Sequence, residues 1–443
     1  MRLTLDPSLE YGVVLEGGGA RGAYQIGALK AVTEAGIRIG AVAGASVGAL
    51  NGAFLCMGDL KAAEELWGNL AYSQILNVED EAIRAIKTLG LKASTVPQFM
   101  AEARKVVSGR GLDITPFKEL LEKYVDEEKI RSSPCDLYVT SLSVTDRREV
   151  VFDVKQAPSG TIKDVLLASA FFPAFKNEKL GGKTYLDGGM VNNVPVDVLA
   201  ERGYKEVVLT GIHLSSYGTD IGDDLLSLIL SVHQVEGICR IRLGSLEPGI
   251  ITEEFARTLS ECPKFCPHFH LSLQSGCDAT LKRMNRHYTA AEYEELCTRL
   301  RSEFEDATLT TDVMVGFSGE TKEDFEISRD FVRKIGFEKV HVFPYSRRAG
   351  TRAAEFPDVV ENAEKERRSR EMIAAAGEVR HEFLERQIGR TVEVLFEEKL
   401  RDGSIQGYTA NYTPVRIKSG CTHGLRKVKI TACGDDWCEG ELI

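Results

Sequence analysis

The segment Ala41–Leu50, AVAGASVGAL, constrains the fold of this chain more than any other stretch. A small apolar run that is typical of a β-strand ends at Gly44, Ser46 follows, and Gly48 opens a helix-forming stretch. This G-x-S-x-G turn forces the serine backbone into a strained conformation, which only small neighbouring residues tolerate. The pattern predicts a nucleophile elbow at Gly44, Ser46 and Gly48, with the hydroxyl at the positive end of a helix. An ordinary small-residue turn is the alternative.

A second glycine-rich turn precedes the first. Gly12–Leu15 is typical of a buried strand, and the loop Gly17–Gly22 (GGGARG) leads into an apolar helical pattern that ends at Gly36. Such a loop cradles anions, because its backbone N–H groups face the helix N-terminus. A dinucleotide site would need an acidic residue at the end of the next strand, and a P-loop would need G-K-[ST]; neither is present. The third candidate is the transient oxyanion that forms when Ser46 attacks an ester.

A serine nucleophile needs a base, and this part of the chain contains no histidine. The first histidine is His213, so a Ser-His-Asp triad cannot be built here. The best candidate is Asp187, which follows the short strand Lys183–Leu186 and precedes two glycines. A carboxylate with the reference pKa of about 3.9 is a weak base, but burial raises that pKa. We therefore predict a Ser46–Asp187 dyad; the alternative is an ordinary D-G-G turn.

Four segments, GGGARGAYQIG, GASVGALNG, ASAFFPAF and DGGMVNNVP, resemble the patatin-like phospholipases in residues and order. The resemblance covers residues 1 to about 200 and implies a three-layer α/β/α domain that hydrolyses acyl esters of lipids. It implies that Ser46 is the nucleophile and Asp187 the general base. It also implies that the glycine loop forms the oxyanion hole, at Gly17, Gly18, Gly19, Ala20, Arg21 and Gly22. D-G-G stands here where the family has D-G-A.

Three further segments of this half have interpretable patterns. Asn77–Arg110 has apolar faces with lysine and arginine, which fit a lipid surface or, alternatively, an ordinary packed cap. Pro116–Val125 has the pattern of an amphipathic helix. Leu137–Val144 and Glu149–Val154 predict a β-hairpin.

From about residue 206 the pattern becomes that of a β/α barrel, in which strands and helices alternate. The predicted strands are Arg240–Leu243, His268–Leu273, Asp312–Val315 and Lys339–Phe343. The predicted helices are Leu225–Val235, Thr252–Leu259, Ala290–Phe304 and Lys322–Ile335. A long charged helix, Val360–Ile388, then leads to a turn-rich segment that predicts a small antiparallel barrel.

This second half resembles the radical-SAM tRNA methylthiotransferases, through VVLTGIHLSSYG, RIRLGSLEPGIIT, HLSLQSGCDATLKRMNRHYT, TDVMVGFSGET and PYSRRAGTRAA. The resemblance implies a radical-SAM barrel and an RNA-binding TRAM domain. That family binds a [4Fe-4S] cluster through C-x3-C-x2-C, but here Cys262 and Cys266 are followed in register by Phe269. We therefore expect no iron–sulfur cluster, no other cofactor and no methylthiotransferase activity, and leave open a vestigial S-adenosylmethionine site. No metal site is expected at the close pair Cys433 and Cys438 either.

The charge of the chain limits which partners it is expected to bind. A net charge of −11 gives no global field that attracts nucleic acid, so an RNA contact needs a local patch. Arg347, Arg348, Arg352 and the run Lys365–Arg368 form such a patch and leave open a weak tRNA contact. A solvated helix face with paired charges is the alternative. His268 and His270, alternating on one strand, are expected to be interior residues.

The sequence predicts an α/β protein with three domains. A patatin-like three-layer domain spans residues 1–215, a partial β/α barrel 216–385 and a TRAM-like β domain 386–443. We expect Glu206–Thr210 to complete the first sheet and the barrel to be an open arc. The predicted function is a serine acyl hydrolase; an RNA-binding protein derived from a methylthiotransferase is the alternative. Without an apolar leader or a spanning segment, we expect a cytoplasmic protein that meets lipid or membrane-surface esters peripherally.

Overall fold

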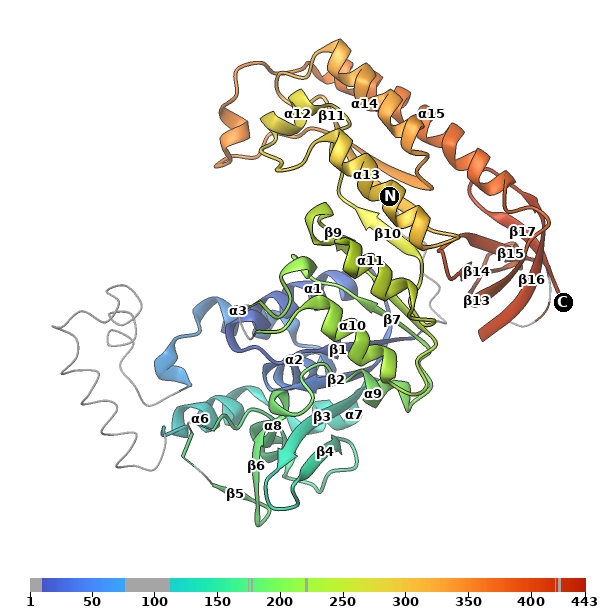
Figure 1. The fold of residues 1–443 in the computed structure, drawn as a ribbon. Helices are drawn as coiled ribbons and strands as arrows, with labels where there is room; N and C mark the ends of the chain where they lie inside the picture. The colour runs from blue at the N-terminus through green and yellow to red at the C-terminus, as the bar shows by residue number, and fades with distance from the viewer. Residues whose placement is uncertain are drawn as a thin grey trace. The chain divides into compact units, whose positions relative to one another are not determined.

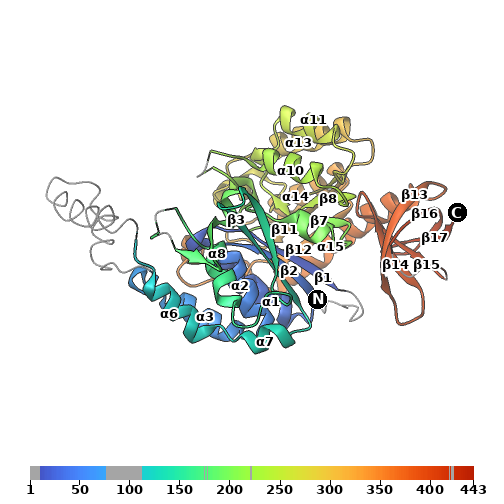
Figure 2. The same cartoon turned by 90° about the horizontal axis from the view of Figure 1, so that it is seen from below.

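The computed structural model describes residues 10–75, 112–173, 175–176, 178–219, 222–418, 420 and 424–443. The chain divides into two compact units, Met1–Tyr204 and Lys205–Ile443, each described by itself (Figures 1 and 2). The predicted insert Asn77–Arg110 lies outside the described residues. None of the described helices is long and apolar enough to cross a membrane. The three predicted domains and their boundaries stay a prediction.

The first unit is built on a six-stranded mixed sheet, in the order β1-β2-β3-β6-β5, with β4 beside β3. The three strands β1, β2 and β3 are parallel, whereas β4 and β6 run antiparallel to β3. The bounds are β1 Tyr11–Leu15, β2 Ile39–Ala45, β3 Asp136–Ser143, β4 Arg148–Asp153, β5 Lys179–Leu180 and β6 Lys183–Asp187. The antiparallel pairing of β3 and β4 confirms the predicted hairpin.

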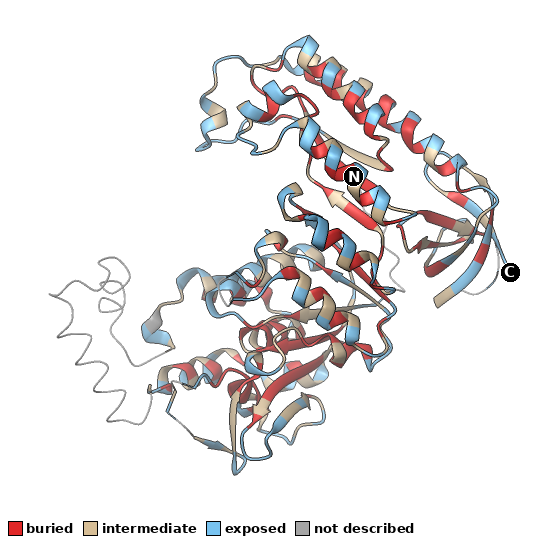
Figure 3. Cartoon of the chain, in the orientation of Figure 1, coloured by how far each residue is buried: buried red, intermediate tan, exposed pale blue. Residues whose placement is uncertain are grey.

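Helices cover both faces of this sheet, because alternate residues of each central strand point to opposite sides. On one face Val42 and Leu137 pack among the apolar residues of α1, α2, α3, α6 and α8. On the other face Ala43 and Tyr138 pack against α9. This is the predicted α/β/α arrangement, and Figure 3 shows the buried strands between the helical layers. The bounds are α1 Gly22–Glu34, α2 Val47–Cys56, α3 Leu60–Asn69, α6 Thr115–Tyr124, α7 Glu127–Ser132, α8 Ile162–Ser169 and α9 Val196–Ala200.

The second unit begins with a strand that we had predicted, wrongly, to belong to the sheet of the first unit. β7 (Glu206–Leu209) pairs in parallel with β8 (Arg240–Leu243) in a two-stranded sheet. Glu206–Thr210 therefore does not complete the first sheet, as we had expected. β7 instead pairs with β8 along its whole length, from Glu206 with Arg240 to Leu209 with Leu243, and Lys205 O also accepts the N–H groups of Cys239 and Arg240.

The remaining strands and helices of this unit have the predicted β/α alternation. Four parallel strands, in the order β12-β11-β10-β9, form an open sheet. They are β9 Ser245–Leu246, β10 His268–Leu271, β11 Thr308–Val315 and β12 Lys339–Pro344. The helices are α10 Leu225–Gln234, α11 Glu253–Ser260, α12 Asp278–Arg283, α13 Ala290–Glu303, α14 Lys322–Ile335 and the long α15 Asn362–Glu385.

The chain ends in a small closed barrel, in the strand order β13-β14-β15-β17-β16, as predicted. The bounds are β13 Thr391–Lys399, β14 Ile405–Thr409, β15 Pro414–Ile417, β16 Gly424–Cys433 and β17 Cys438–Leu442. Leu384, at the end of α15, is fully buried in the barrel core. Two buried arginines of β8 also reach the barrel: Arg240 donates to Tyr408 O at 2.8 Å and Arg242 to Thr409 O at 2.7 Å. Backbone carbonyls at the end of β14 are thus hydrogen-bonded to β8.

Candidate active site

The turn between β2 and α2 has the strained geometry that the sequence pattern predicts. Ser46 has φ 53° and ψ −122° and occupies the N-cap of α2. A Cβ on Gly44 would lie 2.6 Å from the backbone nitrogen of Ala49, and one on Gly48 only 2.2 Å from Leu15 O. Both glycines are therefore required by close backbone contacts, which hold Ser46 at the carboxyl end of its strand.

Ser46 and Asp187 lie together although 141 residues separate them in the chain. The Ser46 Oγ donates to Asp187 Oδ2 at 2.6 Å. Asp187 ends β6 and is 9% exposed, and its Oδ1 accepts the N–H of Gly189 at 2.8 Å. Burial raises the pKa of Asp187, and the hydrogen bonds from Ser46 and Gly189 oppose that rise. A carboxylate with a raised pKa and a contact to the hydroxyl can accept its proton.

A buried serine that the sequence did not single out supports the elbow. Ser169, the last residue of α8, is fully buried, and its Oγ accepts the backbone N–H of Ser46 at 2.8 Å. The same hydroxyl donates to Thr140 O on β3 at 2.6 Å. Ser169 lies in the ASAFFPAF segment, but only the folded chain shows its contact with Ser46.

Asn193 is a second residue whose role was missed, and it changes the prediction for the glycine loop. The Gly17 N–H donates to Asn193 Oδ1 at 3.0 Å, so this amide already has an acceptor. A Cβ on Gly17 would lie 2.7 Å from Asn193 Oδ1 and 3.1 Å from the Ser46 Cβ, so the loop passes close to the hydroxyl. Asn193 lies in the DGGMVNNVP segment, so the sequence motif included this residue although its contact with Gly17 was not predicted.

The six predicted oxyanion donors thus fall into two groups. The N–H groups of Arg21 and Gly22 donate within the turn, to Gly18 O and Gly19 O, and Gly17 is bound to Asn193. These three amides do not fit the predicted role. In the described part of the chain, the N–H groups of Gly18, Gly19 and Ala20 have no backbone or side-chain acceptor. Gly18 has φ 156° and Gly19 has φ 55°, in the region that favours glycine.

A buried amide holds this loop against the helices. Asn51 on α2 donates to Gly22 O at 2.9 Å and to Gln25 Oε1 at 2.9 Å. Its own Oδ1 accepts the indole N–H of Trp67 at 3.0 Å. Gln25 in turn donates to Glu16 O at 2.7 Å. The start of α1 and the loop before it are therefore fixed relative to α2, which carries Ser46 at its N-terminus.

In the second unit, half of the predicted basic cluster has a structural role. Arg368 is 5% exposed and donates to Glu320 Oε2 at 2.6 Å and to Glu364 Oε1 at 2.8 Å. Arg367 pairs with Glu364 and Glu371, and Lys365 is also buried. The run Lys365–Arg368 is therefore not a phosphate-binding patch, because its cations are paired or buried. Exposed members of the predicted cluster are Arg347, Arg348 and Arg352.

The two alternating histidines lie in β10, inside the second unit. Burial, Arg242 and His270 lower the pKa of His268 to about 3, so its ring is neutral at physiological pH. His270 contacts Thr310 Oγ1 at 2.9 Å and Asp312 Oδ2 at 3.3 Å. Within the described ranges, no group of three His, Cys, Asp or Glu side chains is placed to hold a metal ion.

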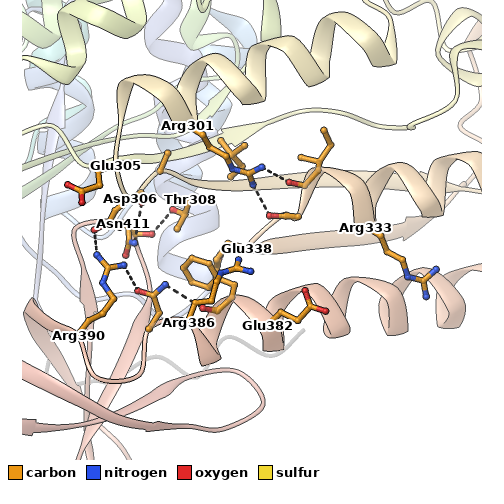
Figure 4. A pocket seen from close by; sticks show the side chains of 16 residues that line it. Arg301, Glu305, Asp306, Thr308, Arg333, Glu338, Glu382, Arg386, Arg390 and Asn411 are labelled. Carbon is orange, nitrogen blue, oxygen red and sulfur yellow. Dashed lines mark hydrogen bonds and ion pairs between the residues drawn. The ribbon is translucent and has the colours of Figure 1, made fainter.

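A cavity of about 510 Å³ opens where α15 meets the barrel (Figure 4). Four arginines and four carboxylates line it: Arg390 forms an ion pair with Asp306, and Arg301 donates to the backbone carbonyls of Ile335 and Gly336. Asn411 also faces it and donates to Asp306 O at 3.2 Å. The lining is thus of mixed charge, which gives no preference for phosphate over a cation.

Comparison with known families separates the two units. Residues 13–200 match the family model described as patatin-like phospholipase, and residues 195–332 match that of the radical SAM superfamily. The first unit therefore carries a patatin-like domain and the second a radical-SAM-like region. Each model covers less than half of the 443 residues.

Curated relatives match the C-terminal part. The threonylcarbamoyladenosine tRNA methylthiotransferase of Thermotoga maritima is 33% identical over 58% of this chain and 61% of its own length. The Bacillus subtilis enzyme of the same name is 36% identical over 55% of this chain and 56% of its own. This chain thus spans little more than half the length of these relatives. Among solved structures, coproporphyrinogen III oxidase from Escherichia coli aligns over 35% of this chain and 37% of its own, with 17% identity and a TM-score of 0.31.

These matches correct one expectation. We expected no cofactor and no iron–sulfur cluster; the radical SAM match and the methylthiotransferase relatives point instead to use of a cluster and S-adenosylmethionine. The described residues do not identify the ligands, because Cys262 and Cys266 have no third ligand grouped with them.

Proposed function

We propose that the first unit is a serine acyl hydrolase that cleaves ester bonds of lipids, with Ser46 as nucleophile and Asp187 as general base. The observation that carries this proposal is the 2.6 Å hydrogen bond between Ser46 Oγ and Asp187 Oδ2. The strained backbone of Ser46 and the patatin-like match over residues 13–200 support it. The lipid class of the substrate rests on that family match.

The reaction takes place in two halves. The Ser46 Oγ attacks the carbonyl carbon of the ester while Asp187 Oδ2 takes the hydroxyl proton. The tetrahedral intermediate then collapses, the C–O bond to the alcohol breaks, and Asp187 returns the proton to the leaving alcohol. In the second half Asp187 takes a proton from water, the resulting hydroxide attacks the acyl-serine, and the acid leaves as Ser46 regains its proton.

The glycine loop supplies the oxyanion donors. Negative charge develops on the carbonyl oxygen during each attack, and preorganised N–H groups stabilise it by about 3 kcal/mol per donor. The N–H groups of Gly18 and Gly19 are the best candidates, since neither has an acceptor among the described residues. The hydrogen bond between the Gly17 N–H and Asn193 Oδ1 positions this loop, and the Gly17 N–H is therefore not counted among the oxyanion donors.

The test is hydrolysis of p-nitrophenyl butyrate by the full chain. We expect turnover by the wild type and its loss in Ser46→Ala and Asp187→Asn. Ser132→Ala is the matched control, because Ser132 is an exposed serine of α7 in the same unit. A Ser46→Ala protein with wild-type turnover would contradict the proposal.

We propose a second, separate function for the second unit, that of contacting tRNA phosphates through Arg347, Arg348 and Arg352. The tRNA-modifying relatives favour it, and these three arginines lie exposed in one short segment. Binding of unmodified tRNA, measured by gel shift at several salt concentrations, should weaken in Arg348→Ala/Arg352→Ala. Arg257→Ala, an exposed arginine of α11, is the control. Equal affinity of both variants would rule out this surface.

A further inference from the structure

Two cysteines face each other across the last hairpin of the second unit. β16 ends at Cys433, β17 begins at Cys438, and the two residues are partners in the antiparallel register. One step closer to the turn, the Gly434 N–H donates to Trp437 O at 2.8 Å. Hydrogen-bonded and non-hydrogen-bonded pairs alternate along such a ladder. Cys433 and Cys438 therefore form a non-hydrogen-bonded pair, with Cα atoms about 4.5 Å apart.

Their side chains lie on the same face of the hairpin. Cys438 is fully buried in the barrel core, and Cys433 packs against that core from a half-buried position. Disulfides form between residues whose Cα atoms are about 4.4–6.8 Å apart. The pair falls in this range without movement of the strands, and both cysteines are free thiols in this structure.

We propose that Cys433 and Cys438 form a redox-sensitive dithiol, which closes to a disulfide when the protein meets hydrogen peroxide. Cys433 reacts first because it is the more accessible thiol. Its sulfur attacks the peroxide, the O–O bond breaks, and a sulfenic acid and one water result. Cys438 then attacks that sulfur, the S–O bond breaks, and the hydroxide leaves with the Cys438 proton as the second water.

The burial of Cys438 fits its part as the second thiol. Burial raises the pKa of Cys438 to about 12, so at neutral pH it stays protonated and does not compete for peroxide. Its Sγ lies 3.8 Å from Leu384 O, which is the acceptor for its proton. Another close pair in the chain, Cys56 and Cys135, is buried at both positions and offers peroxide no comparable access.

The disulfide would cross-link the two ends of a turn that is hydrogen-bonded to α15. Arg380 of α15 donates to Asp436 Oδ1 at 2.8 Å and to Asp436 O at 2.7 Å. Arg416 lies over the ring of Trp437, with its guanidinium carbon 3.6 Å from the ring centroid. Asp436 and Trp437 both belong to the turn that Cys433 and Cys438 flank. Oxidation would hold the two ends of this turn at a fixed spacing.

The experiment uses the full chain before and after a short peroxide treatment. The protein is denatured, its free thiols are alkylated with iodoacetamide, and it is cut with trypsin. Cleavage after Lys429 releases residues 430–443, a peptide that contains Cys433 and Cys438 and no other cysteine. We expect this peptide to be unalkylated and two hydrogens lighter after oxidation, and doubly alkylated after reduction. Double alkylation in the oxidised sample, or a disulfide to another peptide, would overturn the proposal.

Variants separate the two sulfurs. In Cys438→Ser the reaction should stop at the Cys433 sulfenic acid, which dimedone traps; no dimedone adduct would argue against Cys433 as the first thiol. Cys239→Ser is the control, because Cys239 is an exposed lone cysteine, and it should leave the disulfide intact. Hydrogen exchange on the wild type needs no variant. The amides of β16 and β17 should exchange at least roughly tenfold more slowly in the oxidised protein than in the reduced protein. Equal exchange rates would refute the cross-link between the two strands.

Discussion

Ser169 holds the backbone of Ser46 in place: its Oγ accepts the Ser46 N–H at 2.8 Å. The donor belongs to a residue with φ 53°, a conformation that needs support from its surroundings. Because Ser169 is anchored in turn to Thr140 O, the elbow is fixed to the central strand of the sheet. The catalytic geometry that we propose therefore depends on Ser169, a residue that is fully buried behind the elbow.

Replacing Ser169 with alanine should lower both activity and stability. The change leaves the part-buried Ser46 N–H without its acceptor, which costs about 1–3 kcal/mol at most. We expect kcat for p-nitrophenyl butyrate to fall by at least about tenfold, as the elbow loses its support. Steady-state kinetics and urea unfolding measure the two effects.

The control for this prediction is Ser143→Ala. Ser143 lies on the same strand, β3, and is equally buried, but its hydroxyl donates to Asp146 Oδ2 at 2.8 Å and its register partner is Tyr185 rather than Asp187. It should lose stability while keeping kcat. If both variants lose kcat to the same extent, Ser169 acts only through general stability.

Replacing Asp187 with asparagine should abolish turnover and stabilise the fold. Burial raises the pKa of Asp187 in the folded protein. The stability contributed by this group is then present in full below its unfolded-state pKa and is lost as pH rises through the folded-state pKa. At neutral pH the buried carboxylate is therefore unfavourable, and Asp187→Asn should unfold at a higher urea concentration than the wild type.

The same shift sets the pH dependence of activity. The base works only when ionised, so kcat/KM should fall as pH drops through the raised pKa of Asp187 and should level off above it. With no histidine in the first unit, a histidine limb near neutral pH is not expected. A pH profile from 4 to 9 at constant ionic strength checks this dependence, and activity that does not fall toward acid pH would contradict Asp187 as the base.

Two glycine-to-alanine changes should have opposite effects. A Cβ on Gly48 would lie 2.2 Å from Leu15 O, so α2 must move away from β1, at a cost of about 1–3 kcal/mol or more. Gly27 is exposed on α1 with nothing near its Cβ position, and Gly27→Ala should stabilise the helix by about 0.5–1 kcal/mol. Thermal unfolding of the two variants provides the comparison.

Removing Arg368 should destabilise the second unit severely. Glu320, its partner, has a side chain that is only 1% exposed, and Arg368→Met would leave this carboxylate buried and unpaired. Such a loss typically costs about 3–5 kcal/mol. Arg348→Met, at an exposed position, should leave the unfolding midpoint unchanged. Similar midpoints for both variants would show that the buried pair contributes little.

Local sequence patterns predicted much of this protein. The strand–loop–helix pattern at Gly17–Gly22 and the elbow at Ser46 depend on backbone sterics within a few residues. The positions of the small residues in the sequence therefore predict both turns. The β/α alternation of the second unit and its closing barrel follow from periodicity in the same way. The proximity of Ser46 and Asp187 was predicted from motifs and an absent histidine, and the hydrogen bond agrees with it.

Long-range contacts were the part that patterns could not supply. The hydrogen bond of Ser169 spans 123 residues and that of Asn193 spans 176, so neither leaves a periodic signal. The run Lys365–Arg368 looked like a surface patch because its buried partner, Glu320, is 48 residues away. β7 was assigned to the wrong sheet for the same reason: an apolar strand does not specify which neighbour it will pair with.

The corrected position of β7 has an evolutionary consequence. Each described strand finds its ladder partners inside its own unit, and the units divide between Tyr204 and Lys205. Genetic exchange at this seam would split no sheet among the described strands. Each half would keep its own strand pairings, so the two halves are free to diverge independently.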